Sequence, residues 1–321
     1  MDTQISPQTI RLVPDGPVIP ALGVGTWAWG DSLFWDYGKT YGESDLQVAF
    51  DASLQAGVNF FDTAEIYGLG TSEKLLGQFA QAVDQPVHIA TKYFPLPWRF
   101  QAQAVADALT DSLQRLQLPA VDLYQVHWPF DFFMGQQKLM NALAAEVRQG
   151  RIRAVGVSNY SLKQMTEAHS YLAEKGVPLA VNQMQYSLLH RKIESNGLLD
   201  GARNLGITIL AYSPLAQGRL TGKYSFKNTD KPKGARQLDP KFSQEGLVKI
   251  ELVVQTLTQI AEDRDRTPAQ VALNWLIGQG NVVPIPGAKN AAQASQNAGA
   301  LGWELTFDER ERLSKATQPW L

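Results

Sequence analysis

The chain has 321 residues, no cysteine and a net charge of −2, with 44% hydrophobic and 19% charged residues. This balance fits a soluble globular protein and leaves no basic footprint for nucleic acid or an acidic membrane surface. Without cysteine there is no disulfide, thiolate nucleophile or cysteine-ligated zinc, and no apolar run is long enough to cross a membrane. The polar segment 1–9 lacks the layout of a secretory signal, so we expect a cytoplasmic protein.

The first expected element is a β-hairpin, because the apolar runs 10–13 and 18–20 flank the turn residues 14–17. Eight short apolar runs follow, at 22–25, 59–62, 87–92, 121–127, 152–157, 179–183, 207–211 and 282–285. Between them lie segments that repeat apolar residues with the helical period, such as 43–56, 101–117 and 136–149. Further helices are expected at 244–260, 267–277, 291–300 and 307–316. Strands that are apolar at consecutive positions indicate burial on both faces, as in a parallel sheet.

Eight strand–helix units in a chain of 321 residues indicate an α/β fold, a (β/α)8 TIM barrel with an N-terminal β-hairpin, as one domain over residues 1–321. The rival is a doubly wound open sheet, which usually has a Gly-rich fingerprint after its first strand. In the segment 23–30 the third glycine falls too late and two tryptophans occupy the turn, which favours the barrel. The long loop 213–243, after strand seven, has no clear periodicity and is typical of a lid or belt over a site.

Four polar residues lie at the C-terminal side of strands two, three and four: Asp62, Tyr67, Lys92 and His127. The gaps between positions 62, 92 and 127 are 30 and 35 residues, so neighbouring parallel strands would bring these side chains together. A lysine ammonium stabilises a nearby tyrosinate and lowers the pKa of the phenol, while an aspartate keeps the lysine charged. With a histidine to orient the substrate oxygen, the set suits protonation of a carbonyl while hydride reaches its carbon.

Each of these four residues has an alternative structural role. Singly, the aspartate would cap the next turn, the tyrosine pack within its loop, the lysine remain solvated and the histidine serve the structure. Their joint position at the C-terminal ends of strands, where barrel enzymes hold their chemistry, favours the site. The histidines of the chain are scattered without ligand spacing, so we expect no metal.

A second set of polar residues follows strands five to eight and consists of Ser158, Asn159, Gln183, Tyr212 and Lys289. Lys289 precedes an expected helix at which Asn290 and Gln293 form a capping-box variant, so an anion there would complete a phosphate site. The flat ring of Tyr212 suits stacking on a planar cofactor. The alternatives are helix capping for Ser158 and Asn159, core hydrogen bonding or packing for Gln183 and Tyr212, and simple solvation for Lys289.

These motifs resemble those of the aldo-keto reductase family over nearly the whole chain. The matching stretches are long, ordered and correctly spaced, and lie at 59–68, 91–92, 123–129, 150–159, 212–215 and 285–289. The stretch 92–99 resembles members of the family found in cyanobacteria and plastids.

The resemblance implies an NADPH-dependent oxidoreductase that reduces aldehydes or ketones to alcohols. Tyr67 would donate the proton, helped by Lys92 and Asp62, and His127 would orient the carbonyl. Lys289 would contact the 2′-phosphate, which favours NADPH over NADH. The implied cofactor-binding residues are Gly25, Thr26, Trp27, Asp62, Ser158, Asn159, Gln183, Tyr212, Ser213, Pro214, Leu215, Gly218, Lys223, Gly287, Lys289, Gln293, Gln296 and Asn297.

Within that set, Ser158, Asn159 and Gln183 would hold the nicotinamide carboxamide, Tyr212 would stack under the ring, and the stretch 213–224 would close on the pyrophosphate. One position departs from the family. Many relatives have Glu before the last Asn, whereas this chain has Gln296 before Asn297, so the resemblance does not define the adenine contacts there.

Aromatic residues in the loops at the barrel mouth predict an apolar carbonyl substrate, such as an aromatic or medium-chain aldehyde. The expected substrate-binding residues are Trp27, Tyr67, Trp98, His127 and Trp128, although each aromatic could instead only pack its loop on the barrel. Two other functions stay open: an NADP(H)-binding regulatory subunit with slow or vestigial turnover, and a phosphate-binding lyase or isomerase that uses Lys92 as a Schiff base. We expect a monomer, or at most a weak homo-oligomer, with no nucleic-acid or membrane partner.

Overall fold

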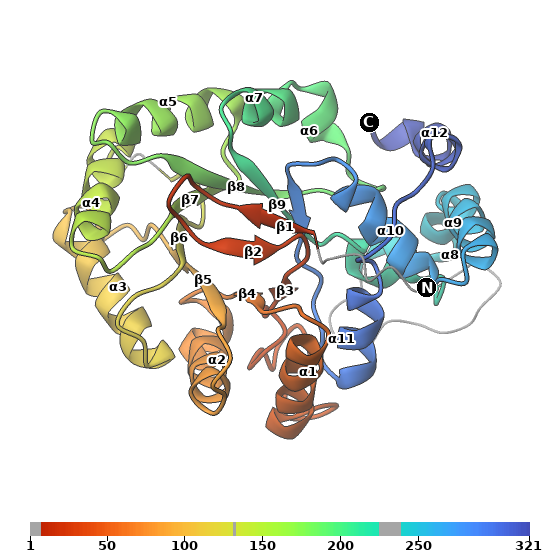
Figure 1. Cartoon of the computed structure of the whole chain (residues 1–321), viewed down its shortest axis with the longest axis horizontal. Helices are drawn as coiled ribbons and strands as arrows, with labels where there is room; N and C mark the ends of the chain where they lie inside the picture. The colour runs from red at the N-terminus through yellow and green to blue at the C-terminus, as the bar shows by residue number, and fades with distance from the viewer. Residues whose placement is uncertain (1–7, 131–132, 225–238) are drawn as a thin grey trace, which may run out of the picture.

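The computed structural model describes residues 8–130, 133–224 and 239–321. At its centre is a sheet of eight parallel strands whose spatial order is their order in the chain (Figure 1). The strands are β3 (Val24–Gly25), β4 (Phe60–Asp62), β5 (His88–Tyr93), β6 (Leu123–Val126), β7 (Val155–Ser158), β8 (Leu179–Gln185), β9 (Thr208–Tyr212) and β10 (Val282–Pro284). All eight predicted apolar runs are therefore confirmed as strands.

The sheet curls until its first and last strands meet. Gly25 forms a parallel bridge with Gly287, and the Gly23 N–H donates to the backbone oxygen of Pro284 at 3.0 Å. A Cβ atom on Gly25 would lie 2.8 Å from the backbone oxygen of Ile285, so a side chain here would push the two strands apart. The fold is the predicted (β/α)8 barrel.

Helices surround the barrel (Figure 1). The connections between strands contain α1 (Glu43–Gln55), α2 (Thr71–Gln81), α3 (Gln103–Leu116), α4 (Gln136–Arg148), α5 (Leu162–Ala173), α6 (Lys192–Ser195), α7 (Leu198–Asn204) and α10 (Pro268–Ile277). After β10 follow α11 (Ala291–Ala298) and α12 (Phe307–Ala316). Thr267 and Thr306 accept hydrogen bonds from the backbone of Gln270 and Glu309, which confirms the predicted starts of α10 and α12.

The prediction of one helix over residues 244–260 was wrong. The chain forms two helices, α8 (Gln244–Val248) and α9 (Glu251–Asp263), because the backbone at Ile250 leaves the helical region with φ −102° and ψ 2°. α8 packs against the 3₁₀ turn η4 (Pro240–Phe242). A Cβ atom on Gly246 would lie 2.6 Å from the Pro240 oxygen, so this contact sets the direction of α8 independently of α9.

The predicted N-terminal hairpin forms from β1 (Thr9–Arg11) and β2 (Val18–Pro20), which pair antiparallel across one end of the barrel (Figure 1). Its buried side chains Leu12 and Ile19 belong to one hydrophobic cluster with interior residues of the barrel, namely Phe60, Ala90, Leu123, Ala154, Ala180, Val181, Leu210, Val283 and Ile285. The hairpin therefore plugs the N-terminal end of the strands. Their C-terminal ends are left for polar side chains.

The long segment after β9 begins with a 3₁₀ turn, η2 (Ala216–Thr221). Residues 225–238 of the predicted loop lie outside the described residues. Within the described ranges, no helix combines the length and the apolar character needed to span a membrane.

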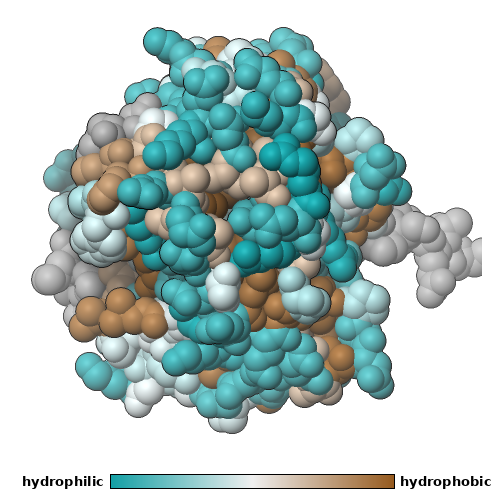
Figure 2. Space-filling view, turned by 90° about the vertical axis from the view of Figure 1, so that its left-hand side faces the viewer, coloured by the Kyte–Doolittle hydropathy of each residue, from teal (hydrophilic) through white to brown (hydrophobic). Residues whose placement is uncertain are grey.

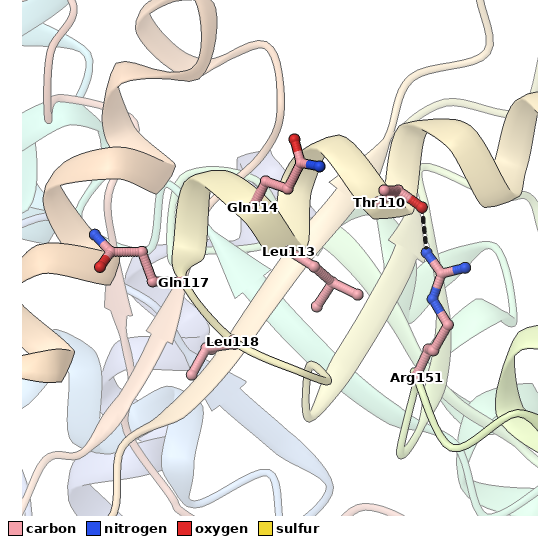
Figure 3. A pocket seen from close by; sticks show the side chains of 6 residues that line it. All are labelled: Thr110, Leu113, Gln114, Gln117, Leu118 and Arg151. Atoms are coloured by element: carbon pink, nitrogen blue, oxygen red, sulfur yellow. Dashed lines mark hydrogen bonds between the residues drawn. The ribbon is translucent and has the colours of Figure 1, made fainter.

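On the face that Figure 2 shows, hydrophilic side chains predominate and hydrophobic ones are exposed between them. A cavity of about 440 Å³ lies on α3 and the turn after it, lined by Thr110, Leu113, Gln114, Gln117, Leu118 and Arg151 (Figure 3). The Arg151 guanidinium at this cavity is already engaged, because it donates to Thr110 Oγ1 at 2.7 Å and pairs with Glu146 at 3.2 Å. None of the predicted site residues lines this cavity.

Candidate active site

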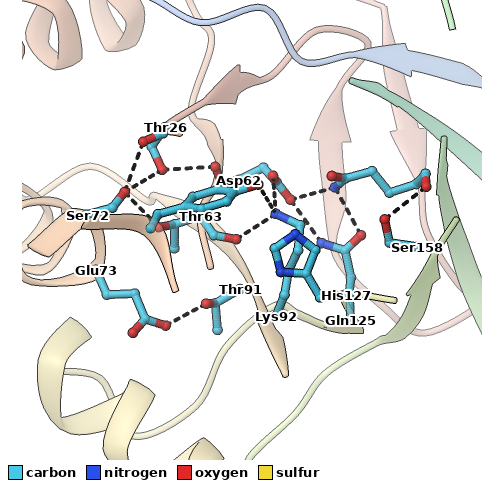
Figure 4. A network of polar contacts seen from close by, with 12 residues as sticks. Thr26, Asp62, Thr63, Ser72, Glu73, Thr91, Lys92, Gln125, His127 and Ser158 are labelled. Atoms are coloured by element: carbon cyan, nitrogen blue, oxygen red, sulfur yellow. Dashed lines mark hydrogen bonds and ion pairs between the residues drawn. The ribbon is translucent and has the colours of Figure 1, made fainter. Parts of the chain in front are cut away.

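The ends of β4, β5 and β6 bring the predicted catalytic side chains together (Figure 4). Lys92 Nζ donates to Asp62 Oδ2 at 2.5 Å and to the backbone oxygen of Thr63 at 2.7 Å. It also lies 3.4 Å from the Tyr67 hydroxyl. The His127 ring lies edge-on to the Tyr67 ring, with 5.7 Å between centroids. The residues that the sequence analysis grouped as catalytic therefore meet in space.

Strand alternation explains why these side chains face one another. In β5, Ala90 belongs to the barrel interior, whereas the next residue, Thr91, donates to Glu73 on the surrounding helix α2. The side chain of the next residue, Lys92, points into the barrel again and is fully buried. Tyr67 reaches the same point from the 3₁₀ turn η1 (Tyr67–Gly70), directly before α2.

Lys92 is charged although no part of its side chain reaches solvent. Burial lowers the pKa of Lys92, but the Asp62 carboxylate and the Tyr67 hydroxyl raise it, and the net pKa lies above the ordinary value. The site therefore contains a buried ammonium shared between a carboxylate and a phenol.

The expectation that Lys92 makes the Tyr67 phenol more acidic was wrong in its net direction. Burial raises the pKa of Tyr67, Lys92 lowers it and Asp62 raises it, so that the balance lies above the ordinary value. Desolvation of the tyrosinate is the largest of these effects. The phenol therefore keeps its proton at neutral pH, the state that a proton donor requires.

His127 is a neutral imidazole in this site. Burial and the Lys92 ammonium lower the pKa of His127 to about 3. Its Nδ1 atom is buried and has no hydrogen-bond partner among the described residues. A proton on Nδ1 would point at no acceptor, so the tautomer with the proton on Nε2 is favoured. Such a ring can donate to a carbonyl oxygen without an ionisation of its own near neutral pH.

Two amides complete the surroundings of Asp62, and the sequence analysis gave a role to only one of them. Gln183 Nε2 donates to Asp62 Oδ1 at 2.8 Å, and Gln125 Nε2 donates to the same oxygen at 2.9 Å. Gln125 is fully buried within β6. A polar residue in an otherwise apolar strand was the signal that could have found it, because a buried polar group needs a partner.

Ser158 and Asn159 lie at the end of β7, beside Gln183 and Tyr212. Ser158 Oγ donates to the backbone oxygen of Gln183 at 3.1 Å and accepts from Asn159 Nδ2 at 3.0 Å. The Tyr212 hydroxyl donates to Asn159 Oδ1 at 3.0 Å. Asn159 has a left-handed backbone, with φ 62°. The helix-capping alternative fails, because Ser161 caps α5.

The segment after Tyr212 contains an unusual run of left-handed residues. Ser213, Gln217 and Gly218 have φ values of 51°, 59° and 98°. Ala216 is left-handed as well, with φ 49°, and the N–H groups of Ala216 and Gly218 donate to the backbone oxygens of Ser213 and Leu215, which closes tight turns. Pro214 and Leu215 lie between these positions, and exposed Lys223 follows them. The segment is therefore a compact series of turns with strained backbone positions, and its role as a belt stays a prediction.

The residues predicted for the adenosine end of the cofactor gather where β10 leads into α11. Asn297 Nδ2 donates to the backbone oxygen of Gly287 at 3.3 Å. Lys289 Nζ lies over two aromatic rings, 4.6 Å from the centre of Tyr41 and 5.4 Å from that of Trp35. The sequence analysis did not connect these rings with the lysine, because they come from the distant β3–α1 loop.

The predicted capping-box variant at α11 forms only in part. Asn290 Oδ1 accepts from the backbone of Gln293 at 2.9 Å, as predicted. The Gln293 side chain, however, accepts from the Lys289 N–H at 2.9 Å. Gln296 is held through its backbone oxygen, which accepts from Gln270 at 3.0 Å.

The predicted substrate-wall tryptophans are partly exposed and partly packed. Trp27, Trp98 and Trp128 have exposed fractions of 38%, 69% and 38%. Trp27 stacks on Phe34 with 5.0 Å between ring centroids, and Trp128 stacks on Phe130 at 6.1 Å. Both tryptophans therefore pack their loops while leaving surface free.

An aromatic neighbour of His127 was missed by the sequence analysis. The Phe94 ring lies edge-on to His127 with 5.6 Å between centroids. Its backbone is clamped, since the Phe94 N–H donates to Glu65 Oε1 at 2.6 Å and its carbonyl accepts from Arg99 at 2.9 Å. Arg99 pairs with both Glu65 oxygens, at 2.5 and 2.9 Å. This pair ties the loop of Tyr67 to the loop after β5.

Thr26, which was predicted to contact a cofactor, is fully buried, and its hydroxyl makes hydrogen bonds within the protein. Its hydroxyl lies 3.0 Å from the backbone oxygen of Asp62 and 2.8 Å from Ser72 Oγ (Figure 4). Ser72 also accepts from Thr63 at 2.9 Å. These hydroxyls support the backbone on which Asp62 stands.

Relatives and solved structures share this architecture. The chain is 40% identical over 316 residues to the chloroplastic pyridoxal reductase of Arabidopsis thaliana, covering 94% of this chain and 85% of that protein. The solved glycerol dehydrogenase of Gluconobacter oxydans superposes with a TM-score of 0.84 at 28% identity, covering 100% of this chain and 97% of the other.

An aldo-keto reductase of Klebsiella pneumoniae, solved in complex with NADPH, superposes with a TM-score of 0.75 at 28% identity, covering 96% of this chain and 94% of the other. The model of the aldo/keto reductase family matches residues 21–318. With that match spanning the barrel and every strand end described above, the chain belongs to the aldo/keto reductase family.

Proposed function

We propose that this protein is an NADPH-dependent carbonyl reductase that converts aldehydes or ketones to alcohols, with Tyr67 as the proton donor. The observation that supports this best is the fully buried Lys92 ammonium, which contacts both the Asp62 carboxylate and the Tyr67 hydroxyl. A tyrosinate formed by proton loss would be stabilised by that ammonium, whereas the free phenol stays protonated.

The residues present fit a nicotinamide dinucleotide. Gln183 offers Oε1, which accepts no hydrogen bond from the described residues, and Tyr212 offers a half-buried ring held by Asn159. The left-handed segment from Ser213 would lie along the pyrophosphate, and Lys289 would offer a cation to the 2′-phosphate. When bound, the cofactor would supply a hydride to the carbonyl carbon.

The protein's own part in the reaction is to hold and protonate the oxygen. His127 would donate from Nε2 to the carbonyl oxygen and keep it beside the Tyr67 hydroxyl. As the carbonyl carbon accepts a hydride, its oxygen becomes an alkoxide, breaks the Tyr67 O–H bond and takes the proton. Lys92 then compensates the negative charge left on the phenol oxygen.

For the substrate we propose an aromatic aldehyde. His127 is flanked by Phe94, and Trp128 and Phe130 form a stacked pair in the same loop. Flat aromatic walls of this kind favour planar apolar ligands. Pyridoxal, the substrate named for the Arabidopsis relative, is the first compound of this class to test.

The test is NADPH oxidation with a panel of aromatic and aliphatic aldehydes, pyridoxal included, comparing the wild type with Tyr67→Phe. We expect kcat to fall by a factor of about 10²–10⁴, the usual contribution of a general acid. NADPH binding, followed by quenching of protein fluorescence, should be retained, because only the hydroxyl is removed. Full activity of Tyr67→Phe would remove the assigned proton donor.

A further inference from the structure

The buried amides of Gln125 and Gln183 have only one consistent orientation. The Asp62 carboxylate is an acceptor, so Gln125 must present Nε2 to Asp62 Oδ1, at 2.9 Å. Its Oε1 atom then faces Gln183, whose Nε2 lies 3.1 Å away. Gln183 Nε2 also faces Asp62 Oδ1 at 2.8 Å. Because Gln183 Nε2 faces two acceptor atoms, the Oε1 atom of the same amide must point away from both of them.

The strands on either side of Gln125 leave room for its long side chain inside the barrel. Gln125 is fully buried and pairs in register with Lys92 on β5. On the other side, β7 has a glycine, and a Cβ atom on Gly156 would lie 2.8 Å from Gln125 Cγ. The long amide of Gln125 therefore uses the space that a side chain at position 156 would fill.

We propose that Gln125 is a positioning residue that fixes the orientation of the Gln183 amide, so that Gln183 Oε1 is presented as the acceptor for the nicotinamide carboxamide. The proposal rests on the proposed function, because it concerns how the same site holds its cofactor. Through Asp62, the arrangement joins the two halves of the site: Oδ2 accepts from Lys92, and Oδ1 accepts from both amides.

An alternative is that Gln125 only fills the barrel interior. The two roles differ in what an isosteric apolar residue would do. Methionine at position 125 would keep the length and volume of the side chain but offer no acceptor to Gln183 and no donor to Asp62. A filling role would leave NADPH affinity unchanged, whereas a positioning role would weaken it.

The first experiment measures the dissociation constant of NADPH by fluorescence titration, without a carbonyl substrate, for Gln125→Met. We expect it to rise about 5- to 30-fold, the effect of misplacing one buried hydrogen bond. Gln136→Met is the matched control: it also removes a buried amide, one that donates to the backbone of Gln164 at 2.6 Å between α4 and α5. The control should bind NADPH as the wild type does.

A double-mutant cycle with Gln183→Met shows whether Gln125 acts through Gln183. If it does, Gln125→Met will have little further effect on NADPH binding once Gln183 is replaced. Independent, multiplying effects of the two substitutions would overturn the proposal.

Gln125→Glu supplies a second test that does not depend on the methionine variant folding well. The titratable groups around this position are Asp62, Lys92, Tyr67 and His127. Burial and the adjacent Asp62 carboxylate raise the pKa of an introduced carboxyl group. While protonated, this group can donate to Asp62 and accept from Gln183, as the native amide does.

NADPH affinity of Gln125→Glu should therefore approach that of the wild type at low pH and fall as the pH rises through the introduced pKa. The wild type should show no such step. A variant that binds NADPH equally well at all pH values, or equally poorly, would contradict the positioning role.

The outcomes separate the two proposals. A wild type that binds no NADPH ends the proposed function and this inference together. A wild type that binds NADPH and a Gln125→Met variant that binds it equally well would overturn the inference alone.

Discussion

The two ends of the barrel interior differ sharply although the same strands build both. At the N-terminal end the inward side chains are apolar and pack on the hairpin residues Leu12 and Ile19. Two residues further along four of these strands, β4, β5, β6 and β8, they are polar. The pairs are Phe60 and Asp62, Ala90 and Lys92, Leu123 and Gln125, and Val181 and Gln183.

The barrel interior therefore has an apolar layer that stabilises the fold and, next to it, a polar layer that forms the proposed site. Side chains in the two layers contribute in different ways. In the apolar layer each side chain contributes by excluding water and filling space. In the polar layer Asp62, Lys92, Gln125 and Gln183 satisfy one another, so each group matters mainly through its partners. Loss of one apolar group leaves a cavity, whereas loss of one polar group leaves a charge or an amide unpaired.

The largest effect is expected from Lys92→Met in the polar layer. It leaves the Asp62 carboxylate buried without its ammonium and Tyr67 without the nearby charge. We expect a loss of about 3–5 kcal/mol in the free energy of unfolding, and kcat lower by at least about 10²-fold. Urea unfolding and NADPH-dependent reduction of an aldehyde measure the two effects.

The control is the double variant Asp62→Asn with Lys92→Met. It removes both charges, so most of the stability should return while the activity does not. If stability stays as low as in the single variant, the carboxylate–ammonium pair is not the source of the loss.

An intermediate effect is expected from Leu123→Ala in the apolar layer. Leu123 is fully buried, and the substitution should lower the free energy of unfolding by about 2–5 kcal/mol through the cavity it leaves. Because Gln125 is held by Asp62 and Gln183 rather than by Leu123, kcat of the folded enzyme should stay within about twofold of the wild type. A large drop in kcat in a fully folded sample of Leu123→Ala would show that the two layers are not independent.

The smallest expected effect is a pH dependence of the free energy of unfolding, which arises from His127 at the polar end of the barrel interior. The pKa of His127 is about 3 in the folded protein, against about 6.5 for an unperturbed histidine. Between these values the unfolded chain binds a proton that the folded protein does not, so this stability is fully present above pH 6.5 and is lost as the pH falls. The loss should be about 1.4 kcal/mol per pH unit, or about 2 kcal/mol at pH 5.

Urea unfolding of the wild type and of His127→Asn between pH 5 and pH 7 isolates this contribution. The variant should lose less stability on acidification than the wild type, whereas Leu123→Ala should keep the wild-type slope. Equal slopes for the wild type and His127→Asn would mean that His127 accepts a proton in the folded protein.

The sequence alone determined the barrel and the group of polar side chains that meets at the C-terminal ends of its strands. Eight apolar runs separated by helical segments leave few topologies, and parallel strands bring their C-terminal ends to one edge, so Asp62, Lys92 and His127 had to be neighbours. These inferences succeed because they depend only on periodicity and on the direction of the chain.

Other features depend on distances that no local pattern encodes. The break between α8 and α9 follows from packing on η4, and the contact of Lys289 with Trp35 and Tyr41 joins loops that are remote in sequence. The orientation of the Gln183 amide follows from its contact with Gln125, which lies 58 positions earlier in the chain.

The protonation state of Tyr67 was decided in the same way. Its neighbours were identified from sequence, and the ammonium does lower the pKa of the phenol as expected. Burial and Asp62 raise that pKa by more, and burial is a property of the folded surroundings rather than of the motif. The sequence determined which groups meet, and only the tertiary structure decided how much water is left between them and therefore which of their charges can exist.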